Sequence, residues 1–161
     1  MSKIKRFCRR SRDSEIGFKI KRLEKEFERA DPRLRAILFE LAFLVKSRLK
    51  KKLLITHIER TQKEQNLLHR ERIAQGFFVW VNGEKFYSED RKKPTLSPHQ
   101  SKPTRAVDLR SRDFIDEEIF KMKKHLDFWF PYGGGRPTFL CHKNSEEHIH
   151  LQVPSEIGGR W

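Results

Sequence analysis

The sequence predicts an α+β fold, in which N-terminal helices pack on a small mixed or antiparallel sheet. Helical spacing prevails up to residue 74 and strand patterns prevail afterwards, an order that is typical of this class. The length of 161 residues suits one domain, and 13 phenylalanines argue against a disordered chain. We therefore expect a single domain over 1–161, with a basic N-terminal extension or helix over 1–30 and the core over 31–155.

Three helices are expected in the first half of the chain. Residues 14–29 place apolar side chains at loosely helical spacing between charged ones, which predicts an amphipathic helix. Asp31-Pro32 is a helix start, an N-cap followed by proline in the first turn, and apolar residues three and four apart continue this helix to about Leu49. A capping box at Thr61 begins a helix that ends at about Ala74.

Most of the remaining elements are strands. Short apolar or alternating runs predict strands at 53–58, 106–109, 138–141 and 148–153. Asn82-Gly83 predicts a hairpin between 77–81 and 85–87. Both faces of this hairpin are apolar, so we expect one face to lie in the core and the other to cover the helices or to line a cleft.

Two further segments connect these strands. Residues 88–105 are polar and contain three prolines, which predicts a long ordered loop of a kind that is usually functional or mobile. A last helix, capped by Asp113 or Asp116, is expected to end near Phe128.

The charge of the chain indicates an anionic partner, such as nucleic acid, a membrane surface or a cell-wall polymer. Its 36 Lys+Arg outnumber 22 Asp+Glu, which gives a net charge of +14. Residues 1–60 hold 19 basic and 8 acidic residues, a net charge of +11, so the rest of the chain is nearly balanced. Chemistry in the later part therefore need not be driven by net charge.

The sequence excludes two broad classes. Its longest apolar stretch, 36–45, is broken by Glu40 and is about half as long as a membrane span. The basic start has no apolar region behind it, so we expect synthesis in the cytoplasm without a signal peptide. Cys8 and Cys141 are too few for a disulfide framework or a cysteine-based zinc site.

Two histidines share one face of the predicted last strand. In the segment 148–153, polar and apolar residues alternate, so His148 and His150 point to the same side. Such a pair suits a metal or hydrolytic site, although a single pair is by itself more typical of a solvated strand face.

An earlier segment adds a third histidine and an aspartate. Ser97-Pro98-His99 ends the long loop, and Asp108 lies between two apolar residues of the next strand. Taken alone, Asp108 would suit a surface salt bridge to Arg105 or Arg110. His99, Asp108 and His150 together supply three ligands and leave one tetrahedral position open, which is the pattern of catalytic zinc.

These segments occur in the order of a known family. Ser97-Pro98-His99…Ala106-Val107-Asp108 matches a Ser-x-His…Ala-x-Asp pattern, and Glu147-His148-Ile149-His150 matches Glu-x-x-His or His-x-His. The family's ITS-x-x-R-T-x-x-x-Q segment stands here as ITHIERTQKEQ over Ile55 to Gln65, with His57 in place of the serine. The chain thereby resembles, over about residues 53–154, the zinc peptidases of the D-Ala-D-Ala carboxypeptidase and L-Ala-D-Glu endopeptidase family, many of which are phage endolysins. The family usually has six residues between its His and Asp ligands, whereas eight stand here.

The resemblance implies a role for each matching residue. His99, Asp108 and His150 would bind Zn²⁺, and Arg60 would contact the substrate or the developing oxyanion. Glu147 would be the general base, provided that the last strand begins after it; otherwise His148, on the ligand face, is the better base.

Other residues have both a functional and an ordinary interpretation. Ser97 would orient the ligand loop and contribute to substrate binding, or serve only as a turn residue. His142 and Tyr132, with the glycines 133–135, would line a substrate groove, although a loop histidine is more often solvated. We expect His57 and His125 to pack or to face solvent.

The hypothesis that follows is a monomeric zinc metallopeptidase that cleaves a bond of the peptidoglycan stem peptide, as a phage or prophage endolysin does. It would degrade the cell wall after release from the cytoplasm, or act within a bacteriophage particle. Residues 1–12 would hold it on an anionic cell envelope. Two alternatives remain: a basic nucleic-acid-binding module with incidental histidines, for which no specific recognition signature is present, and a zinc-binding but inactive structural protein of a virion.

Overall fold

The computed structural model describes residues 16–132, 136–143 and 147–155, and within them the α+β class is confirmed: five α-helices accompany a mixed sheet of five strands. The basic segment 1–12, with Cys8, and the glycines 133–135 lie outside the described residues. The strands lie in the order β1-β2-β5-β7-β6. They are β1 (Ile16–Phe18), β2 (Leu53–His57), β5 (Ala106–Arg110), β6 (Phe139–His142) and β7 (His148–Gln152). β1 and β2 are parallel, and every other neighbouring pair in this sheet is antiparallel.

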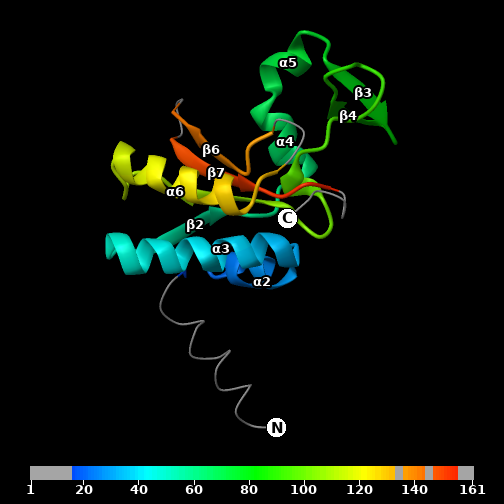
Figure 1. Cartoon of the computed structure of the whole chain (residues 1–161). Helices are drawn as coiled ribbons and strands as arrows, with labels where there is room; N and C mark the ends of the chain where they lie inside the picture. The colour runs from blue at the N-terminus through cyan, green and yellow to red at the C-terminus, as the bar shows by residue number, and fades with distance from the viewer. Residues whose placement is uncertain (1–15, 133–135, 144–146, 156–161) are drawn as a thin grey trace.

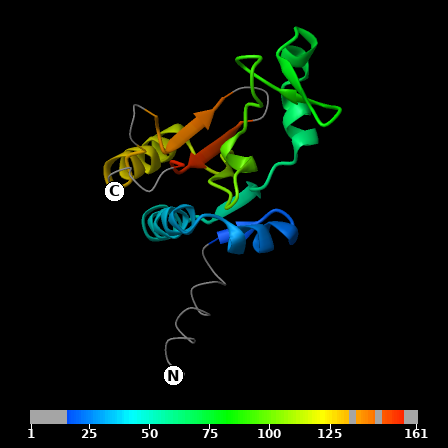
Figure 2. The same ribbon diagram turned by 90° about the vertical axis from the view of Figure 1, so that its right-hand side faces the viewer.

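One face of the sheet is covered by helices. Helix α3 (Pro32–Leu44) and helix α6 (Asp116–Trp129) lie side by side over it, and α2 (Arg22–Arg29) lies near α3 (Figures 1 and 2). The apolar core between the layers includes Val107, Leu109, Ile149 and Leu151 on the strand side. Because side chains alternate along a strand, the residues between these four point to the opposite face.

The N-terminal region differs from the helix predicted over 14–29. Ile16–Phe18 form β1, and α2 begins only at Arg22. Gly17 lies beside Leu54 of β2, and a Cβ at this position would lie 3.0 Å from Cδ1 of that side chain, which would have to shift slightly. The pairing of β1 with β2 buries Ile16 and satisfies backbone groups, and this long-range contact outweighs a weak local helical pattern.

Helix α3 begins and continues as its sequence predicts. The Asp31 side chain accepts a hydrogen bond from the backbone N–H of Arg33, and proline occupies the first turn. The helix passes into a π-helical turn, η1 (Val45–Leu49), and ends at Lys50, whose φ of 57° is left-handed.

The residues between β2 and the long loop form a separate lobe. Helices α4 (Gln62–Leu68) and α5 (Arg70–Ala74), divided at His69, carry a hairpin of β3 (Phe78–Val81) and β4 (Glu84–Tyr87). The capping box at Thr61 and the Asn82-Gly83 turn, with φ of 48° and 81°, are confirmed. The expectation that one hairpin face lies in the core is wrong: β3 and β4 form their own two-stranded sheet, and Trp80 is 64% exposed.

The last helix begins differently from the prediction. Ile115 is its N-cap residue and offers no side-chain cap, while the Glu118 carboxylate accepts the N–H of Ile115. Asp113 instead pairs with Arg110, and Asp116 is the first helical residue, so neither is the cap. Among the described residues, no helix is long and apolar enough to cross a bilayer.

Candidate metal centre

Two antiparallel strands hold the first two residues of the predicted ligand set. Asp108 on β5 and His150 on β7 are directly opposite each other in the register. Each alternates with core residues of its strand, so both side chains lie on the face of the sheet away from α3 and α6. This placement confirms the face that alternation predicts for them.

A short 3₁₀ helix brings His99 to the same place. This helix, η2 (Pro98–Gln100), lies in the long loop after the hairpin, and Ser97 caps it by accepting the N–H of His99 at 3.1 Å. The Gln100 side chain accepts the N–H of Ser97 and donates to Gln62 at the start of α4. The loop is thus fixed at both ends of η2, which holds His99 against the sheet.

The three side chains converge on one point. Oδ1 of Asp108 lies 2.8 Å from Nδ1 of His150 and 3.2 Å from Nε2 of His99, and the two histidine nitrogens are 3.3 Å apart. Ligand atoms around a tetrahedral zinc ion, at 2.0–2.2 Å from it, lie roughly 3.3–3.6 Å from one another. The triangle is slightly contracted relative to these values, and its donor set fits a metal ion.

The tautomer of His99 supports this fit. Its Nδ1 lies 2.6 Å from the carbonyl oxygen of Ile58, and because a carbonyl only accepts, Nδ1 is the protonated nitrogen. A neutral ring then presents the lone pair of Nε2 toward Asp108 and His150. Such a hydrogen bond on the far nitrogen is the usual support of a metal-ligating histidine.

Burial and charge hold these groups in metal-binding protonation states. Burial lowers the pKa of His99, so its imidazole is neutral at neutral pH. Burial alone would raise the pKa of Asp108, but it is opposed most strongly by the hydrogen bond from Nδ1 of His150, and the pKa of Asp108 lies far below its usual value. The site therefore combines one carboxylate with neutral imidazole, a set of ligands that suits zinc and related metals.

Arg60 is the cation nearest the carboxylate. Its guanidinium lies 3.7 Å from Oδ2 of Asp108, donates to the Gln65 side chain at 3.3 Å, and is largely buried. Burial lowers the pKa of Arg60 and the Asp108 charge opposes this shift, and the group stays protonated. The backbone N–H of Arg60 also donates to the carbonyl of His99, so the predicted substrate residue and the ligand loop are joined.

Further histidines surround the three candidate ligands. Nε2 of His148 lies 3.7 Å from Oδ1 of Asp108, and His142, directly opposite on β6, has its ring 4.8 Å from that of His148. His142 is exposed on β6 beside the site, and its role in a substrate groove stays a prediction. Burial, and then the neighbouring His148 and His150, lower the pKa of His142.

His57 also lies next to the site, where it packs as one of the two interpretations of this residue expects. Its ring packs edge-on against that of His99, with centroids 5.4 Å apart. Its Nε2 is buried and makes no hydrogen bond within the described part of the chain. Burial lowers the pKa of His57, and His99 lowers it further. A bulge in β2 at Thr56 puts His57 opposite Asp108, and this irregularity has no signal in the sequence.

Glu147 occupies a different place from the ligands. Strand β7 begins after it, at His148, which meets the first condition for a role as base. Its side chain is exposed. Burial raises the pKa of Cys141, and the charge of Glu147 raises that pKa by a smaller amount. Within the described residues, the charged and imidazole groups within 4 Å of Asp108 belong to Arg60, His99, His148 and His150. The role of Glu147 stays a prediction.

Tyr132 and the basic neighbours of Asp108 are placed away from the carboxylate. Asp31 and burial have the larger effects on the pKa of Arg33, and Tyr132 raises this pKa further. Tyr132 therefore lies near the start of α3. Arg105 donates to the carbonyl of Val153, and Arg110 pairs with Asp113. The ordinary interpretation of Asp108 as a partner of Arg105 or Arg110 is therefore wrong.

Comparisons of this chain with protein-family models, with curated proteins and with solved structures give no match. Any functional conclusion therefore rests on the sequence and on the geometry of the site.

Proposed function

We propose that the protein is a zinc-dependent peptidase that cleaves a peptide bond in the stem peptide of peptidoglycan. The observation that carries this proposal is the meeting of His99, Asp108 and His150, which come from three segments far apart in the chain, with ligand atoms 2.8–3.3 Å apart. The resemblance of the same three residues to the endopeptidase and carboxypeptidase motifs supplies the reaction and the class of substrate.

A zinc ion held by these residues would act as a Lewis acid and lower the pKa of water from 15.7 to about 7. The protein would supply the remaining functions. Arg60, the only guanidinium within 4 Å of Asp108 among the described residues, would face negative charge that develops on a substrate carbonyl. His148 and Glu147 are the two candidates for the proton-accepting base, and His148 is the one that lies on the ligand face.

The test combines metal content with product analysis. Purified protein, after dialysis against a buffer with trace zinc, is expected to contain one equivalent of zinc by mass spectrometry of the metal. It should also release shorter muropeptides from purified peptidoglycan. His150→Gln is expected to abolish both the bound metal and the cleavage. His125→Gln is the matched control, since His125 pairs with Glu40 on the helical side of the sheet and should leave both unchanged.

Two further variants separate the candidate bases. Glu147→Gln and His148→Gln should both retain zinc, and the one that removes cleavage identifies the base. Folded wild-type protein that takes up no metal would contradict the proposal. Zinc uptake without cleavage of any muropeptide would contradict the peptidase activity and favour a structural role in a virion. Binding to DNA or RNA that falls steeply with salt, in a metal-free protein, would favour the nucleic-acid alternative.

A further inference from the structure

A second pair of imidazoles lies beside the candidate metal centre, on the last two strands of the sheet. His142 on β6 is directly opposite His148 on β7 in the register. His148 precedes Ile149, which lies in the core, and His142 follows Cys141, which packs against the core. Because side chains alternate along a strand, both imidazoles lie on the face of the sheet that carries the candidate metal centre.

The spacing of these two rings suits a shared metal ion. Their centroids are 4.8 Å apart, which is close to the 5.0 Å between the rings of His99 and His150 in the candidate metal centre. A zinc ion lies about 2.0–2.1 Å from each imidazole nitrogen that binds it, so two rings that share one ion at a tetrahedral angle have centroids roughly 5 Å apart. The rings of His142 and His148 are tilted by 37° instead of stacked flat on each other.

The surroundings of the pair favour a cation. His142 is exposed, and 31% of the His148 side chain is accessible, so an ion can reach both from solvent. Nε2 of His148 lies 3.7 Å from Oδ1 of Asp108, and this carboxylate attracts positive charge to the place. Arg110, opposite His148 on β5, has its own charge paired with Asp113 at 2.6 Å.

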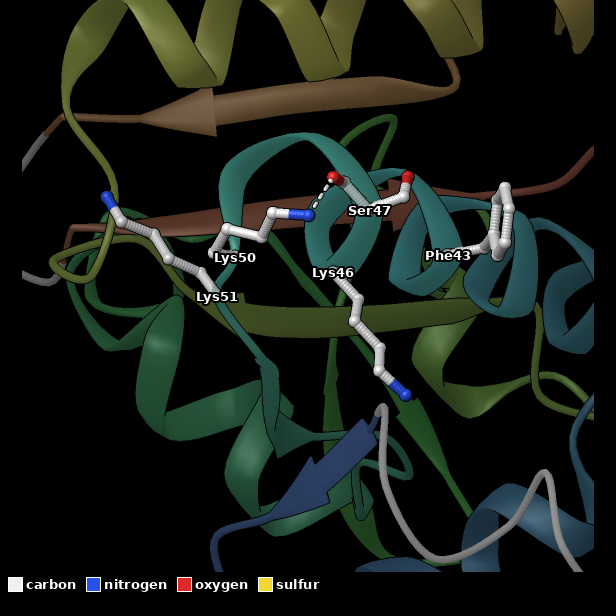
Figure 3. Close-up of a pocket in the computed structure, with 5 residues that line it drawn as sticks. All are labelled: Phe43, Lys46, Ser47, Lys50 and Lys51. Carbon is white, nitrogen blue, oxygen red and sulfur yellow. Dashed lines mark hydrogen bonds between the residues drawn. The ribbon is translucent and has the colours of Figure 1, made fainter.

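The helical side of the sheet offers poorer ligands. A hollow of about 540 Å³ at the end of α3 is lined by Phe43, Lys46, Ser47, Lys50 and Lys51 (Figure 3). Its side chains supply one hydroxyl and three ammonium groups, which do not bind a cation. An imidazole and a carboxylate do meet on α3 and α6, where Nε2 of His125 lies 3.0 Å from Glu40. The experiment below therefore includes this pair as the rival site.

We propose that His142 and His148 form a second site for a divalent transition-metal ion, beside the first. Two imidazoles suit Zn²⁺, Ni²⁺ or Cu²⁺, whereas Mg²⁺ and Ca²⁺ prefer oxygen ligands. Among the described residues, no third metal-ligating side chain lies close enough to join the pair, so water completes the coordination. The second site is therefore weaker than the first, and an ion in the first site opposes its filling by charge repulsion. This inference does not depend on the peptidase activity.

Equilibrium dialysis of the full chain against increasing free Zn²⁺ tests the proposal. The wild type is expected to take up one equivalent of zinc at low concentration and a second at higher concentration, measured by mass spectrometry of the metal. His142→Gln should lose the second equivalent and keep the first. His150→Gln should lose the first and keep the second. His125→Gln, the matched control for adventitious binding, should keep both.

Nuclear magnetic resonance of the imidazoles locates each ion directly. In spectra that correlate ring nitrogens with ring protons, zinc should first shift the signals of His99 and His150. Only a further addition of zinc should shift those of His142 and His148. The signals of His125 should stay unchanged throughout the titration.

Each contrary result overturns the proposal. A wild type that binds a single equivalent at all zinc concentrations would exclude a second site. A second equivalent that persists in His142→Gln, with circular dichroism showing an intact fold, would place that ion elsewhere on the chain, and its loss in His125→Gln would assign it to the pair with Glu40. The first site is judged separately: a wild type without tight zinc, whose weak equivalent is lost in His142→Gln, would contradict the proposed function and support the second site.

Discussion

Ser97→Ala separates the positioning of His99 from the general stability of the fold. The Ser97 hydroxyl accepts the N–H of His99 at 3.1 Å; the carbonyl of His99 also accepts the N–H of Arg60, and its ring makes a 2.6 Å contact to the carbonyl of Ile58. Loss of a serine N-cap typically costs about 1 kcal/mol of unfolding free energy. Loss of a contact that orients a ligand typically lowers metal affinity about 10–100-fold. Because the Ile58 contact remains, we expect the low end, about tenfold.

Thr61→Ala is the matched control for this prediction. Thr61 also caps a helix with its hydroxyl, which accepts the N–H of Glu64 at 3.2 Å, but that helix carries no ligand. Both variants should lose about 1 kcal/mol in urea unfolding. Only Ser97→Ala should lose zinc affinity, measured by competition with a chromophoric chelator. Wild-type affinity in Ser97→Ala, or an equal loss in Thr61→Ala, would refute the conclusion that the cap positions the ligand.

Three further predictions concern the scaffold. Burial would raise the pKa of Asp31, but hydrogen bonds from Arg33 lower this pKa below its usual value. The ionised carboxylate therefore stabilises the fold above about pH 4, and this contribution disappears as the pH falls. In urea unfolding, Asp31→Asn should therefore be less stable than the wild type near neutral pH and approach it in acid; a constant difference would argue against this. Leu41→Ala, at a fully buried position of α3, should cost about 3 kcal/mol, whereas Leu67→Ala, 65% exposed, should cost less than about 0.5 kcal/mol in the same assay. Gly83→Ala, at φ of 81° with open space around it, should cost about 1 kcal/mol through backbone strain alone, seen as faster amide exchange confined to the hairpin.

The ligand set was predictable because its members lie on regular elements. Asp108 and His150 each sit between apolar residues of a strand, and the period of two fixes their face without knowledge of the partner strands. His99 follows a serine and a proline that begin a short helix, so its loop has a defined local structure. Local rules therefore predicted the face of Asp108 and His150, while their grouping with His99 came from the catalytic-zinc pattern and from the resemblance to the peptidase motifs.

The features that the sequence did not reveal depend on contacts between distant segments. His57 reaches the site through a bulge in β2, which arises where that strand pairs with β5. β1 forms only because β2 is beside it, and the helical spacing of 14–29 contains no information about that neighbour. The backbone groups of β3 and β4 pair with each other, so the hairpin forms outside the main core although both of its faces are apolar.

Asp108 occupies a position where strand stability alone would favour an apolar residue. β5 lies between two other strands, and its residues from Ala106 to Leu109 are all buried. A buried carboxylate has a desolvation cost of several kcal/mol, and even a paired buried charge is often no more stable than a well-packed apolar replacement. Its nearest guanidinium, on Arg60, is 3.7 Å away, and its closest contacts are imidazoles, of which at least His99 is neutral at neutral pH. A residue that conflicts with its local environment in this way is typical of a functional site, because local consistency is what the rest of a fold requires. The single charge in the run Ala-Val-Asp-Leu is therefore the residue around which the function of this protein is best sought.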